Sequence, residues 1–149
     1  RLRIVDIFSD FDDRELALLA SVMHTRSYSG HQTVFQKGDR AAACYVILSG
    51  DIEVTVEGED NVLTPVARLT PGRLFGEIAL VDGGLRSATC RAGDAGAELA
   101  LLGRAEFDQI FNAGNRFAFK LLDIIGERVV QRVRKAAGEL VGVIMDERR

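Results

Sequence analysis

The sequence predicts a mainly β protein with flanking helices, in which the strands form a sandwich or a jelly-roll barrel. Three observations favour this fold class. Short strand-like runs, separated by turns that glycine marks, follow one another from residue 27 to residue 102. No long helical pattern interrupts these runs, although a parallel α/β sheet would require one. Helical periodicity is confined to the two ends of the chain, before residue 27 and after residue 103.

Length and composition are those of one globular domain. The 149 residues can bury a core without metals or disulfides, and 47% apolar with 28% charged residues is ordinary. The net charge of −3 argues against a surface built for nucleic acid. No apolar run approaches the roughly 20 residues that span a bilayer, and no signal peptide follows Arg1. We expect a cytoplasmic domain over residues 1–149 that binds neither nucleic acid nor a membrane by itself.

A short helix is expected at the start of the chain, because Asp12 or Asp13 can cap its free N–H groups. Its apolar positions are Leu16, Leu18, Leu19 and Val22.

Residues 51–57 form the clearest of the expected strands. Ile52, Val54 and Val56 alternate there with acidic residues and a threonine. Period two with one apolar face predicts a sheet that covers a core on one side. Residues 58–61, Gly-Glu-Asp-Asn, then indicate a turn, and residues 62–69 return as the hairpin partner. Further turns are expected at residues 30, 38–39, 49–50, 70–72 and 93–94, with strands at residues 33–36, 43–48, 87–92 and 97–102.

After Gly103 the period becomes helical. Residues 104–111 predict a short helix, residues 112–115 interrupt it, and a long helix follows from about residue 116 to residue 140. Its apolar residues recur at spacings of three and four: Leu122, Ile125, Val129, Val133, Ala136 and Leu140. This stripe either packs on the protein's own barrel or forms the seam of a homodimer. We therefore divide the chain into a barrel over about 27–102 and C-terminal helices over 104–140.

The cysteines and histidines indicate no metal or catalytic centre. Cys44 and Cys90 lie in strand-like stretches and are expected to be buried free thiols, while a disulfide requires their strands to lie side by side. Together with His24 and His31 they form no metal-binding spacing. This argues against a haem sensor and against a jelly-roll metalloenzyme, which needs a close histidine pair and a carboxylate. No Ser/His/Asp arrangement exists either, so we expect no cofactor and no enzyme.

One segment has the residues of an anion site. Gly76 lets the backbone bend sharply, and a short helix that opens there presents free N–H groups at its positive end. Arg86 can bind a phosphate with two parallel hydrogen bonds, and Ser87 adds a hydroxyl donor. Glu77 fits such a site if the ligand also carries hydroxyl donors, as a ribose phosphate does. The structural alternative is that the glycines are plain turns and that Arg86 and Glu77 form a surface ion pair.

The residues 75–80, Phe-Gly-Glu-Ile-Ala-Leu, with residues 86–89, Arg-Ser-Ala-Thr, resemble the phosphate-binding cassette of cyclic-nucleotide-binding domains. The resemblance extends from about residue 8 to residue 135 and includes residues 36–39, Gln-Lys-Gly-Asp, and residues 45–54, Tyr-Val-Ile-Leu-Ser-Gly-Asp-Ile-Glu-Val. It implies a jelly-roll barrel whose C-terminal helices act as hinge and capping helices. It also implies cAMP or cGMP as ligand, with cAMP favoured, and a signal carried by movement of the last helix.

The resemblance also implies roles for individual residues. Glu77 would accept from the ribose 2′-hydroxyl, and Arg86 would pair with the cyclic phosphate. The remaining contacts around the ribose phosphate would come from Gly76, Ile78, Ala79, Ser87 and Ala88. Arg132 lies about where the last helix would cap the base, and its guanidinium either stacks on the purine or is simply solvated.

Two departures from the family pattern matter. Leu85 stands where many members have proline, so the loop before the arginine is less rigid. The Thr-Ser pair that reads adenine in catabolite activators falls near Arg132 and Val133, so the base contact does not carry over. Two other functions remain open: a degenerate barrel that serves protein interaction or dimerisation, and the sensor half of a transcription regulator. Residues 141–149 are too few for a helix-turn-helix motif.

Overall fold

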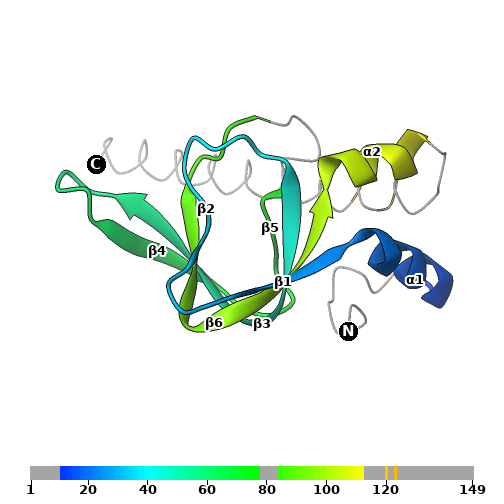
Figure 1. The fold of residues 1–149 in the computed structure, drawn as a ribbon, viewed down its shortest axis with the longest axis horizontal. Helices are drawn as coiled ribbons and strands as arrows, with labels where there is room; N and C mark the ends of the chain where they lie inside the picture. The colour runs from blue at the N-terminus through cyan, green and yellow to red at the C-terminus, as the bar shows by residue number, and fades with distance from the viewer. Residues whose placement is uncertain (1–10, 78–83, 113–119, 121–122, 124–149) are drawn as a thin grey trace, which may run out of the picture.

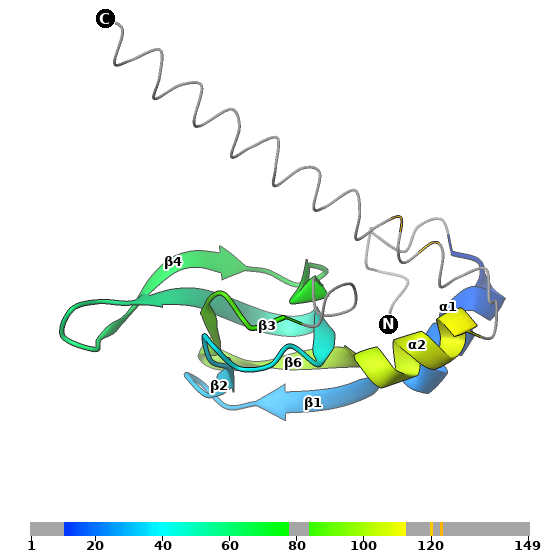
Figure 2. The same ribbon diagram turned by 90° about the horizontal axis from the view of Figure 1, so that it is seen from above.

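The computed structural model describes residues 11–77, 84–112, 120 and 123. The order of elements is one helix, six strands and one helix. They are α1 (Asp13–Val22), β1 (His24–Tyr28), β2 (Thr33–Phe35), β3 (Ala43–Glu57), β4 (Leu63–Leu69), β5 (Leu74–Phe75), β6 (Thr89–Gly103) and α2 (Arg104–Asn112). In both ribbon views α1 and α2 lie at the same end of the sheet (Figure 1, Figure 2).

All six strands belong to one antiparallel sheet. Its main path runs β1-β6-β3-β4, while β2 also pairs with β6 and β5 with β3. The mainly β architecture with flanking helices is therefore confirmed. The hairpin between β3 and β4, which extends beyond the other strands (Figure 2), has the turn expected at residues 58–61.

β3 and β6 are longer than the sequence predicts. Residues 43–48 and 51–57 form one strand, and the separate strands expected at 87–92 and 97–102 also merge. The turns expected at residues 49–50 and 93–94 are therefore wrong. Gly50, with a φ of 74°, makes a local irregularity in the β3–β6 pairing instead of a reversal. A Cβ there would lie 2.1 Å from the carbonyl oxygen of Gly96, so the two strands approach closely at this point.

Helix α1 begins as expected at an aspartate. Asp12 is the cap, since its carboxylate accepts from the N–H of Glu15 at 2.8 Å. Glu15 Oε1 accepts from the N–H of Asp12 in return, which completes a capping box. Leu16 and Leu19 are buried, whereas Leu18, another apolar position of this helix, is 40% exposed. The sequence did not identify β1, because its residues are mostly exposed and polar.

The core is an apolar cluster between the strands. Its buried members are Tyr45, Ile47, Ile52, Phe75, Cys90, Ala92, Ala97, Leu99 and Leu101. Both cysteines are buried free thiols, as expected. Although β3 and β6 lie side by side, Cys44 is opposite Leu102 and Cys90 is opposite Val54, so the two thiols do not meet.

Helix α2 confirms the short helix expected at residues 104–111. The long helix expected from residue 116 to residue 140 lies outside the described residues, apart from Lys120 and Asp123. Within the described part of the chain, no helix has the length and apolar character that crossing a bilayer requires.

Candidate functional site

The first part of the site is the end of β5. Phe75 is opposite Tyr45 of β3, and Gly76 then turns the chain with a φ of 69°. A Cβ at Gly76 would lie 2.7 Å from Arg86 Nη1 and 3.4 Å from the ring of Tyr45. Only glycine combines this backbone conformation with so close an approach of the guanidinium.

The second part is the segment that precedes β6. It is held by main-chain bonds to the loop after β2: the N–H of Arg86 donates to Asp39 O at 2.8 Å, and Gly38 N donates to Arg86 O at 2.9 Å. The N–H of Ala41 donates to Gly84 O at 2.9 Å. These bonds fix the backbone at Arg86, so its side chain enters the site from a defined position.

Arg86 is 8% exposed and its guanidinium is the centre of the site. Nη1 donates to Gly76 O at 3.1 Å, and Nη2 donates to Ala43 O at 2.6 Å. The Nε atom is buried and has no hydrogen-bond partner among the described residues. A buried donor without a partner costs free energy of about 1–3 kcal/mol, so the site is prepared for an acceptor that enters from outside.

An aromatic wall supports the guanidinium. Its Cζ lies 4.1 Å from the centre of the Phe35 ring and 5.7 Å from that of Tyr45. The Tyr45 and Phe75 rings stack at 5.1 Å between centroids. Strands β2, β3 and β5 thus each contribute one ring around Arg86.

Glu77 brings a carboxylate to the same place. Its side chain is fully buried and lines the pocket described below. Burial raises the pKa of the nearby Cys44 thiol to about 12, and the negative charge of Glu77 contributes in the same direction. Arg86 acts in the opposite direction on this pKa, so Cys44 senses both charges.

These residues surround a cavity of about 350 Å³, a volume typical of small-ligand sites. Its lining includes residues from both cassette segments: Gly76, Glu77, Gly84, Leu85, Arg86, Ser87 and Ala88. The other lining residues, Phe35, Ala41, Val54, Leu69, Phe75 and Cys90, form an apolar wall. Burial raises the pKa of Cys90 to about 11, so at neutral pH its thiol behaves as part of the apolar wall.

The structure brings together five of the eight expected site residues. Gly76, Glu77, Arg86, Ser87 and Ala88 line one pocket, although they come from both sides of an eight-residue gap in sequence. Ile78, Ala79 and Arg132 lie outside the described residues. No group of three or more potential metal ligands occurs within the described ranges.

Sequence reasoning missed the apolar wall. Val54, Leu69 and Cys90 belong to strands β3, β4 and β6, and their alternation with polar neighbours is that of ordinary core residues. Only the pairing of the strands shows that these side chains face a cavity. A second omission concerns the opposite face of β3, where Glu53 and Thr55 are buried although the pattern placed them away from the core.

Comparison with known proteins defines the class to which the fold and this pocket belong. The family model described as cyclic nucleotide-binding domain matches residues 25–113, and the chain is a member of that family. The family is defined by binding of a ligand, and the relatives that share it include cAMP-dependent protein kinase regulatory subunits.

Particular relatives fall into several kinds of protein. The chain is 32% identical over 71% of its length to a cGMP-dependent protein kinase of Caenorhabditis briggsae, of which it covers 14%. It is 34% identical over 73% of its length to a cAMP-dependent protein kinase regulatory subunit of Yarrowia lipolytica, covering 28% of that protein. The crystal structure of the Thermus thermophilus catabolite activator protein matches 90% of the chain with a TM-score of 0.78 and 28% identity, over 61% of that protein. The chain therefore spans only 14% and 28% of these two curated relatives, and it shares the jelly-roll fold of the catabolite activator protein.

Proposed function

We propose that the pocket binds a cyclic nucleotide, cAMP in preference to cGMP, and that binding is signalled through the C-terminal helix without any catalysis. The observation that carries this proposal is the buried, unpartnered Nε of Arg86, a residue that lines a ligand-sized cavity. A phosphate oxygen is the acceptor that this geometry fits best, because guanidinium–phosphate bonds are charge-assisted.

The carboxylate of Glu77 supports a ribose phosphate over a simple anion. It lines the same pocket, and a site for a bare anion would gain nothing from a buried negative charge. A ribose 2′-hydroxyl is a donor that such a carboxylate can accept. We assign Gly76, Ser87 and Ala88 to the ribose phosphate as well, together with Ile78 and Ala79.

The apolar wall supports the preference for adenine. Val54, Leu69 and Cys90 offer no strong hydrogen-bonding group to a base. Each base has one exocyclic amine, but guanine also has a carbonyl and a ring N1–H, which would lose water against this wall without replacement. Adenine exposes fewer polar groups there and should bind more tightly.

A route for the signal is supported by neighbouring hydrogen bonds. Arg86 Nη2 donates to Ala43 O, while the preceding carbonyl, Ala42 O, accepts from the N–H of Arg104 at 2.8 Å. Arg104 is the first residue of α2. Arg86 and the start of α2 therefore bind the carbonyl groups of two consecutive residues, Ala43 and Ala42, at the beginning of β3. A ligand that alters the Arg86 contact can thereby alter the position of α2.

Calorimetric titration with cAMP and with cGMP tests the proposal. We expect a dissociation constant in the micromolar range or below for cAMP and weaker binding of cGMP. At a hundredfold excess over that constant, the free energy of unfolding should rise by about 2.7 kcal/mol, which thermal melting detects. No heat and no melting shift at millimolar concentrations of either nucleotide would reject the sensor function. That result would favour the alternative of a barrel retained only for protein interaction.

A further inference from the structure

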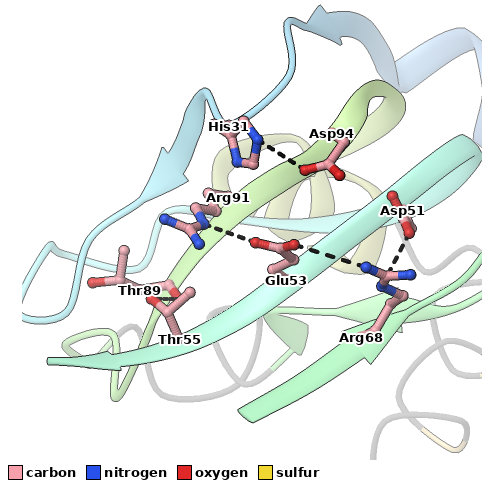
Figure 3. Close-up of polar contacts among 8 residues, drawn as sticks. All are labelled: His31, Asp51, Glu53, Thr55, Arg68, Thr89, Arg91 and Asp94. Carbon is pink, nitrogen blue, oxygen red and sulfur yellow. Dashed lines mark hydrogen bonds and ion pairs between the residues drawn. The ribbon is translucent and has the colours of Figure 1, made fainter. Parts of the chain in front are cut away.

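The outer face of β3 carries a row of polar side chains, each joined to a neighbouring strand (Figure 3). Asp51 Oδ2 lies 3.2 Å from Arg68 Nε of β4. Glu53 Oε2 accepts from Arg91 Nε of β6 at 2.8 Å, and its Oε1 lies 3.9 Å from Arg68 Nη2. The row therefore links three adjacent strands of the sheet by charged groups.

Glu53 is the central residue of this row. Its side chain is 8% exposed, compared with 21% for Arg91 and 62% for Arg68. A carboxylate so deeply buried is unfavourable unless cations pair with it. Both oxygens of Glu53 face an arginine, one from each flanking strand, so the charge is compensated only when all three strands hold this register.

The opposite face of the same three positions forms the wall of the pocket. Side chains alternate between the two faces of a strand. Val54 follows Glu53, Cys90 precedes Arg91 and Leu69 follows Arg68, and all three line the cavity. On each of β3, β6 and β4, a residue of the ion pairs is thus the sequence neighbour of a residue of the apolar wall.

Strand β4 has the weakest attachment of the three. Among the described strands it pairs only with β3, and the pairing shifts register between Val54 and Thr55. The turn at residues 58–61 fixes the register on its own side of this shift, while Glu53, Arg68 and Leu69 lie beyond the shift, farther from the turn. The contacts of Arg68 with Glu53 and Asp51 add a constraint there, next to Leu69.

We infer that Glu53 is a positioning residue of the nucleotide pocket. Through Arg91 and Arg68 it holds β6 and β4 in the register that presents Cys90 and Leu69 to the ligand. This inference rests on the proposed function for its effect on nucleotide affinity, while its effect on the pocket wall does not require any ligand.

Glu53→Gln tests the inference, because it keeps the size of the side chain and removes its charge. The matched control is Asp94→Asn, which removes the carboxylate that lies 2.8 Å from His31 Nε2 and makes no ion pair with Glu53, Arg68 or Arg91 (Figure 3). Three quantities are measured for each variant: the melting temperature, the dissociation constant of cAMP, and the alkylation rate of Cys90 without ligand. Peptide mass spectrometry separates Cys90 from Cys44.

We expect Glu53→Gln to remain folded at the assay temperature, with a dissociation constant raised about three- to tenfold and Cys90 alkylated several times faster. Asp94→Asn should have the wild-type dissociation constant and the wild-type alkylation rate of Cys90. A loss of stability alone cannot produce the change in affinity, since apparent affinity falls only in proportion to the folded fraction. If Glu53→Gln fails to fold, Arg91→Gln replaces it, because Arg91 is partly exposed and its loss releases β6, the strand that carries Cys90.

The inference requires that the weaker binding of cAMP and the faster alkylation of Cys90 occur in the same variant. A folded variant with wild-type affinity, or with wild-type alkylation of Cys90, overturns the inference. If the wild type itself binds no cyclic nucleotide, the proposed function fails separately. The alkylation rate then decides alone: faster reaction in Glu53→Gln supports the positioning role, and an unchanged rate rejects it.

Discussion

The guanidinium of Arg86 is held in place before any ligand arrives. Two of its nitrogens donate to Gly76 O and Ala43 O, and its face lies on the Phe35 ring. A side chain that is already ordered loses little conformational entropy on binding. The remaining Nε–H can therefore contribute nearly its full interaction to a bound phosphate.

Arg86→Leu is expected to weaken cAMP binding far more than Ser87→Ala. The first removes the positive charge assigned to the phosphate and leaves Glu77 beside an anion, whereas the second removes one neutral donor. Arg86→Lys should fall between them, because an ammonium keeps the charge and loses the planar fork. Titration calorimetry on the three variants gives this order, and equal affinity of the wild type and Arg86→Leu would show that the phosphate binds elsewhere.

Gly76→Ala should abolish high-affinity binding and lower stability. The substitution forces a left-handed backbone at a non-glycine residue, at about 1–3 kcal/mol, and places a methyl group against the guanidinium. Gly72→Ala is the matched control, since Gly72 has a φ of 88° and nothing within 4 Å of its Cβ position. Denaturant unfolding should show a similar loss of stability in both variants, with affinity reduced only at Gly76. Equal affinity losses would mean that backbone strain, and not the contact with Arg86, is responsible.

At the scale of elements, the sequence predicts those whose signals are local. The cap of α1 at Asp12, the turn at residues 58–61 and the start of α2 all depend on residues within one turn of each other. The continuity of β3 and β6 depends on pairing between distant residues, which overrides the turn preference of Gly50 and Gly93. Physical context, and not residue type, decides whether such a glycine reverses the strand or bends it.

The same distinction applies to the site. The cassette residues could be predicted because Gly76, Glu77 and Arg86 are close in sequence and chemically unusual together. The wall residues Val54, Leu69 and Cys90 are ordinary apolar residues on three strands. Glu53 was missed because an alternating pattern assigns a carboxylate to the solvent, and only the two arginines across the sheet make its burial possible.

The long helix expected at residues 116–140 is the element in which we expect ligand-dependent change. Saturating cAMP should slow backbone hydrogen exchange across residues 116–140, because a ligand shifts a helix only through a contact that differs between its positions. Arg132→Ala should reduce this protection and weaken binding modestly if its guanidinium stacks on the base, an interaction of about 0.5–2 kcal/mol. Identical exchange with and without nucleotide would exclude this helix as the output element.

At the scale of the whole molecule, helix α1 contacts a residue that follows α2 in the sequence. Lys120 Nζ lies 2.6 Å from Glu15 Oε1, the same oxygen that completes the capping box of α1. It also lies 5.5 Å from the centre of the Phe11 ring. The N-terminal helix and the residue at position 120 are thus joined by an ion pair.

The apolar stripe of the long helix leads to a prediction about assembly. Val129→Glu together with Val133→Glu should convert a homodimer to monomer in analytical ultracentrifugation, since buried apolar contacts become buried charges. The melting transition of the barrel should be little changed. Arg134→Glu, which lies off the stripe, serves as the control and should leave assembly intact. A wild-type protein that sediments as a monomer at all concentrations would place the stripe on its own barrel instead.

Strands β1 and β6 are the first and last strands of the sheet in sequence, and they pair with each other, for example at His24 and Leu101. During synthesis on the ribosome, β1 to β5 emerge before any residue of β6, and three of them pair with it. Contacts between such distant residues form slowly, because long loops must close first. Cys90, which belongs to the apolar wall of the pocket, lies on that last strand. A nascent chain consequently has no pocket, and a nucleotide cannot act as a template for folding: it can stabilise only the finished barrel.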